Sequence, residues 1–151
     1  MTFRLGVAIA AMGLLSACSE RVLASAGEVL VVVEDIKASA PNTTATAHDI
    51  FPEPRPISDE PGAEKVDRMR FEIEVDCAHG TSGDRLQETT TADGQVLSRR
   101  VPHVVLTHPK PDSIGASLVS SVCDPDVRSA NTVRRSLRTI EREYRRRQAR
   151  S

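Results

Sequence analysis

The sequence predicts a small α+β domain: a small antiparallel β-sheet with one amphipathic helix tied to it by a disulfide, plus a basic C-terminal helix. Three observations lead to this class. Residues 69–77 alternate strictly between apolar and polar side chains, residues 113–123 have helical spacing, and Cys77 and Cys123 end these two segments. Only 3% of the 151 residues are aromatic, so the core must be small and aliphatic.

The first 17 residues have the pattern of a cleaved lipoprotein signal peptide. One positive charge, Arg4, precedes an uncharged stretch at 5–17. As a helix this stretch spans about 20 Å, which is too short to cross a bilayer core of about 30 Å. It ends Leu-Ser-Ala-Cys at 15–18, which resembles the bacterial lipobox. We therefore expect cleavage before Cys18 and attachment of lipid to Cys18.

Two alternatives to this interpretation stay open. Ala-Ser-Ala at 24–26 suits ordinary signal peptidase, and the product would be secreted or periplasmic. The N-terminal segment could instead be a buried helix with an ordinary core cysteine. The lipoprotein interpretation places the protein in the cell envelope, held to a membrane by its lipid. Ser19 after the cysteine favours the outer membrane over the inner one.

The remaining cysteines support an oxidising compartment. If lipid consumes Cys18, an even number remains, and a Cys77–Cys123 disulfide is the simplest pairing. It would close a loop of about 47 residues and stabilise the fold by about 4 kcal/mol. Two buried free thiols are the alternative.

The predicted domain covers 28–127, after a short tether at 18–27. Residues 29–33 are a β-branched run, which predicts a strand buried on both faces. Residues 37–66 hold five of the nine prolines and no sustained period, so we expect a long Pro-rich loop.

The remaining strands should form an antiparallel meander. After 69–77, strands are expected at 84–91, 95–101 and 103–107. Asp93-Gly94 suits a type I′ turn, which needs positive φ at both central residues. Ser113 can then cap a helix that buries Leu118 and Val122 and ends at Cys123.

Four short segments in 67–125 resemble the bacterial surface-adhesin protein E family. They are Val-Asp-Cys at 75–77, Asp-Gly-Gln-Val at 93–96, Pro-Asp-Ser at 111–113 and Ser-Ser-Val-Cys at 120–123. The resemblance implies an antiparallel sheet with a helix tied across it by a disulfide. It also implies a lipid-anchored surface or periplasmic protein with an adhesive or binding role, and a protein ligand or anionic lipid is the expected partner.

Residues 128–151 form an Arg-rich amphipathic tail. They hold nine arginines and two glutamates, a net charge of +7, which leaves −8 for residues 1–127. An apolar seam spaced 3-4-3-4 predicts one helix: Ala130, Val133, Leu137, Ile140 and Tyr144. The following arginines are expected to bind an anionic surface: Arg134, Arg135, Arg138, Arg142, Arg145, Arg146 and Arg147.

Several interpretations of the tail compete. Its seam could pack on its own domain, lie in the interface of an anionic membrane, or dock on a partner helix. It could also be disordered. A nucleic-acid arm is disfavoured by the export signal, so no nucleic-acid partner is expected. A further hypothesis has the tail lie over the acidic strand face formed by Glu72, Glu74 and Asp76.

No catalytic constellation is visible in the sequence. The four histidines form no HExxH motif, no Gly-x-Ser-x-Gly turn is present, and no glycine-rich phosphate loop occurs. The sequence therefore predicts a non-enzymatic envelope protein without a metal or cofactor, acting by adhesin-like binding. The alternative is a periplasmic structural or membrane-associating factor whose tail contacts anionic lipid or an envelope partner.

Overall fold

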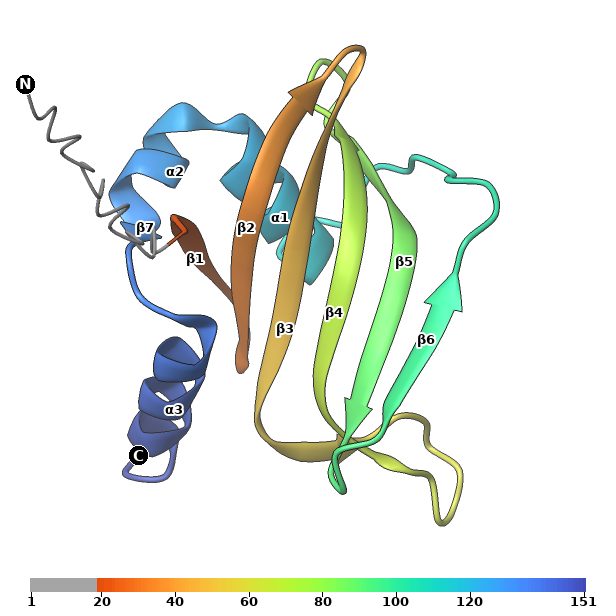
Figure 1. Cartoon of the computed structure of the whole chain (residues 1–151), viewed down its shortest axis with the longest axis vertical. Helices are drawn as coiled ribbons and strands as arrows, with labels where there is room; N and C mark the ends of the chain where they lie inside the picture. Colours follow the sequence, from red (N-terminus) through yellow and green to blue (C-terminus); the bar gives the residue numbers. More distant parts are fainter. Residues whose placement is uncertain (1–18) are drawn as a thin grey trace, which may run out of the picture.

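The computed structural model describes residues 19–151, so Cys18 and the expected signal peptide lie outside the described residues. Within 19–151 the chain forms a seven-stranded antiparallel sheet and three helices (Figure 1). The strand order is β6-β5-β4-β3-β2-β1-β7. The strands are β1 (Arg21–Ala26), β2 (Val29–Ser39), β3 (Asn42–Pro56), β4 (Lys65–Asp76), β5 (Thr81–Thr91), β6 (Val96–Arg100) and β7 (Thr132–Val133). The helices are α1 (Ile114–Cys123), α2 (Pro125–Asn131) and α3 (Leu137–Gln148). The α+β class is confirmed, although the sheet is larger than predicted.

β2 is buried on both faces, as its valine run predicts. Val31 and Val33 pack in one cluster with Leu118 of α1, whereas Val32 packs in a second cluster with Ile140 of α3. Successive side chains of a strand point to opposite faces, so α1 and α3 cover opposite sides of the sheet. The β-branched side chains suit this position because they are stiff and pack well on a pleated surface.

β4 confirms the alternation found in the sequence. Ile73 and Val75 are buried, while the alternating residues Glu72 and Glu74 keep contact with solvent. β4 pairs with β3 on one side and β5 on the other. A strand with two partners and one covered face requires this period of two.

The β5–β6 hairpin lies where Asp93-Gly94 predicts it, but the turn type differs. Only Gly94 has positive φ, at 88°. The Gly94 amide donates to the Thr91 carbonyl at 2.9 Å, and the Thr91 amide donates to the Gln95 carbonyl at 2.9 Å. These bonds define a three-residue loop, in which a single left-handed glycine is enough to close the hairpin.

α1 begins and ends as predicted. The Ser113 hydroxyl accepts a hydrogen bond from the Ala116 amide at 3.2 Å, which satisfies a free donor of the first turn. Cys123 ends the helix and forms a disulfide with Cys77, with 5.3 Å between the Cα atoms. The predicted pairing is confirmed, and it ties α1 to the end of β4.

The predicted tether at 18–27 is wrong, because residues 21–26 form β1. Val22 is buried and pairs with Val33 of β2, and β1 also pairs with β7 on its other side. The sequence interpretation missed this strand, although β1 and β2 form a hairpin with only Gly27 and Glu28 between them.

The predicted Pro-rich loop at 37–66 is also wrong. β2 continues to Ser39 and β3 occupies Asn42–Pro56. Pairing of β3 with β2 ends at Ile50, so later residues have β4 on one side only. The Ile57 amide donates across to Glu64, so the nitrogen of Pro56 faces the open edge. Proline is tolerated there because no ladder donor is needed.

Two further expectations fail. The strand expected at 103–107 is reduced to an isolated bridge between Thr107 and Ser82. The single tail helix is divided into α2, β7 and α3, because Asp124 and Ser136 each start a new helix and residues 132–133 pair with β1.

Candidate functional site

The candidate site is the solvent-facing side of α3. Ser136 starts this helix by accepting a hydrogen bond from the Thr139 amide at 3.2 Å. Arginines at 145–147 occupy the last turn, where cations interact favourably with the helix dipole. Local sequence therefore fixes both ends of α3.

The apolar seam of α3 packs on its own sheet. Ile140 is buried with 4% of its surface exposed, beside Val32 and Ile50. Leu137 and Tyr144 pack around it, and the Tyr144 hydroxyl donates to the Glu28 carbonyl. Among the competing interpretations of the tail, the structure shows the seam packed on the domain.

Three arginines point away from that seam. Arg138, Arg142 and Arg146 are four residues apart, so they lie on one helical face with a rise of about 6 Å between neighbours. All three are exposed, and no salt bridge within residues 19–151 involves them. We call these three residues the arginine stripe.

The arginines before the helix lie beside the start of the described chain. Arg134 forms a salt bridge with Glu20 at 2.6 Å and is still 75% exposed. Arg135 pairs with Glu143, and its carbonyl accepts a hydrogen bond from Arg21 at 2.8 Å. Both guanidinium groups extend the cationic surface at the N-terminal end of α3.

Arg145 does not belong to this surface, contrary to the sequence prediction. Its guanidinium lies 2.9 Å from the Asp67 carboxylate of β4 and 3.1 Å from Glu141. Arg68 of the same strand also reaches Glu141 at 3.2 Å. These ion pairs fasten α3 to the sheet. Arg147 is exposed in the last turn and has no salt bridge within the described residues.

The hypothesis that the tail covers Glu72, Glu74 and Asp76 is wrong. Glu72 pairs with Arg70 at 3.2 Å, and Asp76 pairs with His79 at 2.7 Å. The tail reaches Glu20 and Asp67 instead, because the apolar seam directs α3 to the β2–β3 part of the sheet.

A buried polar chain supports the start of α3. Glu34 of β2 accepts from His48 of β3 at 3.0 Å and lies 2.6 Å from Arg21 of β1. Arg21 in turn donates to the Arg135 carbonyl. Burial lowers the pKa of His48, which favours the neutral ring. These contacts hold the segment that carries Arg134 and Arg135 against β1 and β2.

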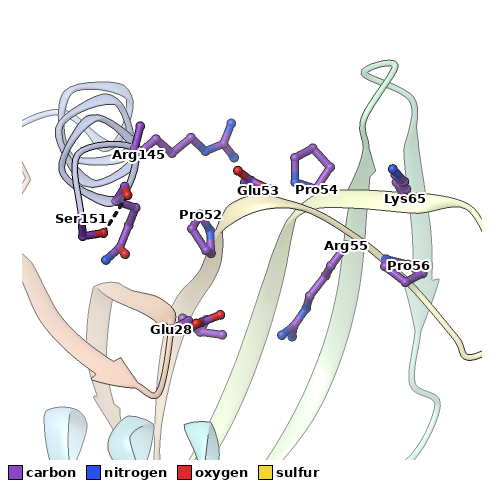
Figure 2. Close-up of a pocket in the computed structure, with 12 residues that line it drawn as sticks. Glu28, Pro52, Glu53, Pro54, Arg55, Pro56, Lys65, Arg145 and Ser151 are labelled. Carbon is purple, nitrogen blue, oxygen red and sulfur yellow. Dashed lines mark hydrogen bonds between the residues drawn. The ribbon is translucent and has the colours of Figure 1, made fainter.

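A cavity of about 520 Å³ lies between the C-terminal end of α3 and the proline-containing end of β3 (Figure 2). In this view Arg145 extends from α3 toward Glu53, whereas the Arg55 side chain points to the opposite side of the β3 ribbon. The Arg55 guanidinium stacks 3.8 Å from the centre of the Phe51 ring. Acidic and basic groups share the lining, so the charge of this cavity does not select a ligand.

No group of three metal-ligating side chains occurs in residues 19–151. None of the helices there is long and apolar enough to cross a membrane. Comparison of the chain with protein-family models, curated proteins and solved structures finds no match.

Proposed function

We propose that this is a lipid-anchored, non-enzymatic protein of the bacterial cell envelope, and that it acts by binding an anionic surface through the arginine stripe. The observation that carries the proposal is the orientation of α3. Its seam is buried against Val32 and Ile50, and its unpaired arginines face solvent. The docked helix therefore presents cations and not an apolar face, which favours electrostatic attachment over insertion.

The spacing of the stripe supports a binding role. Like charges four residues apart repel each other and destabilise a helix by about 0.2–0.5 kcal/mol per pair. Arg138, Arg142 and Arg146 make two such pairs without a neutralising carboxylate in the described residues. An anionic ligand would neutralise this repulsion. Binding of such a ligand therefore explains why the helix carries a cluster that lowers its own stability.

Vesicle flotation tests this proposal. The chain from Ser19 to Ser151 contains the whole described core and no acyl group, so its binding reports the protein surface alone. We expect it to float with vesicles containing phosphatidylglycerol and not with pure phosphatidylcholine. Each arginine near an anionic surface contributes about 1 kcal/mol. The variant R138Q/R142Q/R146Q should therefore bind about 100-fold more weakly.

A charge-matched variant serves as the control. Lys37, Arg85 and Lys110 are exposed and lie outside α3 and β6, and K37Q/R85Q/K110Q removes the same charge. It should bind like the unmodified chain, and binding should weaken as salt shortens the Debye length from about 10 Å at 0.1 M. Equal losses in both triple variants would mean that net charge, not the stripe, controls binding.

Adhesin-like binding of a protein ligand is the second candidate. It is supported by the Cys77–Cys123 disulfide, which the resemblance to the protein E family implies. Adhesion requires display outside the cell, whereas binding of lipid headgroups also works from the periplasm. Protease treatment of intact cells separates the two. Loss of the protein supports surface display, and protection supports a periplasmic location at either membrane.

A further inference from the structure

The sheet begins almost at the proposed lipid attachment point. Ser19 and Glu20 are the only residues between Cys18 and β1, which starts at Arg21. Three residue steps extend at most about 11 Å. If Cys18 carries lipid, as the proposed function holds, the folded domain sits directly on the membrane surface and not on a flexible stalk.

The same few residues contact the start of α3. Arg21 donates to the Ser19 carbonyl at 3.1 Å and, from the same nitrogen, to the Arg135 carbonyl at 2.8 Å. The Glu20 carboxylate lies 2.6 Å from Arg134. Ser19 and Glu20 therefore form one continuous surface with Arg134 and Arg135, which precede α3.

The arrangement of the elements places this surface on one side of the molecule. In Figure 1, β1, β7 and α3 lie along the left side, and β6 lies at the opposite edge. α3 follows the β1–β7 edge and covers one face of the sheet, and the stripe lies on the side of α3 away from the seam, so it faces solvent beside that edge. A bilayer beneath the anchor would therefore lie against Arg134 and the stripe together.

From this geometry we infer that the partner of the stripe is the headgroup layer of the same bilayer leaflet that holds the lipid anchor. The inference rests on the proposed function and names its anionic surface. Acyl chains retain the protein, so the arginines serve to orient it, with α3 flat on the leaflet and β6 pointing away. Attachment at Cys18 raises the local headgroup concentration around the stripe, which makes weak single contacts effective.

Headgroup quenching on the intact lipoprotein tests the inference. Full-length lipidated protein is inserted into vesicles that contain phosphatidylglycerol and a nitroxide on the lipid headgroup. A fluorophore is attached to A149C, on the same helical face as the stripe, or to V105C, which is 72% exposed in the segment after β6. The dye at 149 should be quenched several-fold more than the dye at 105. R138Q/R142Q/R146Q should remove this difference without releasing the protein, and K37Q/R85Q/K110Q should keep it.

Other outcomes separate the inference from the function on which it rests. Suppose both dyes are quenched equally, yet the anchored protein captures a second population of anionic vesicles through the stripe. The same-leaflet inference is then overturned, and binding of an anionic surface survives. Equal quenching without capture would overturn both. Preferential quenching at 105 would place β6, and not α3, against the leaflet and refute the orientation.

Discussion

Asp49 is a buried carboxyl group in β3. It is 4% exposed, shares a face with the core residues Ala47 and Phe51, and its Oδ1 atom has no hydrogen-bond partner. Burial raises its pKa from 3.8 to about 7, while the positive charge of Arg55 opposes the shift. The carboxyl group is therefore protonated in the folded state over a pH range in which the unfolded chain has lost that proton.

The raised pKa of Asp49 predicts how stability changes with pH. Between about pH 4 and pH 7 the folded state binds the extra proton, so its stability falls as pH rises through this window. The loss is complete above the folded pKa and amounts to at most about 4 kcal/mol. Asp49→Asn removes the titration, so it should stabilise the fold at pH 8 and have little effect at pH 4, as measured by urea unfolding. Exposed Asp59→Asn is the control. Parallel stability curves for Asp49→Asn and wild type would contradict this assignment.

The disulfide joins two elements that are 46 residues apart in the chain. In the chain-entropy model, a loop of this length stabilises a fold by about 4 kcal/mol. Reduction should therefore lower the free energy of unfolding by about that amount, measured from urea curves with and without reductant. C77A/C123A should match the reduced protein and ignore reductant. An unchanged urea midpoint after reduction would show that α1 is held by packing alone.

Docking of α3 depends on a small apolar cluster. Val32, Ile50 and Ile140 are its buried members. Ile140→Ala should cost about 2–5 kcal/mol because it leaves a cavity. We expect the loss to appear first as faster amide hydrogen exchange in α3, since Ile140 is the buried residue of this helix. Val105→Ala, at a 72% exposed position, should change nothing. If exchange accelerates uniformly through β3 and β4, α3 is an integral part of one cooperative unit.

Sequence patterns predicted the elements that local chemistry determines. The alternation in β4, the Ser113 cap and the arginine stripe depend on neighbours within a few residues. The errors have different sources. At β1 a local signal was missed, because β1 and β2 form a hairpin with only Gly27 and Glu28 between them. Pro56 fits β3 because its nitrogen faces an open edge. Arg145 turns inward because of Asp67, 78 positions away in the chain, and no local pattern shows that partner.

The two edges of the sheet differ across the whole molecule. At one edge, β7 has only two residues and leads directly into α3. At the other, all five residues of β6 are exposed, and Val96 and Leu97 keep 60% and 46% of their surfaces in contact with solvent. An open apolar edge strand is a template for pairing with another chain. In the inferred orientation this edge points away from the bilayer, where neighbouring copies could meet it.

Arg99 and Arg100 are the charged residues of β6, and both are exposed. Charged side chains on an edge strand oppose its pairing with another chain, so we expect these two arginines to protect the β6 edge. Pairing with a second β6 strand would take these guanidinium groups partly out of water, which the cost of desolvating a charge opposes. R99T/R100T should therefore increase self-association of the chain from Ser19 to Ser151, measured by sedimentation velocity over a concentration series. R138T/R142T changes the net charge equally but leaves β6 intact, and it should sediment like the unmodified chain. If both variants associate to the same extent, colloidal charge governs association and the β6 edge has no special role.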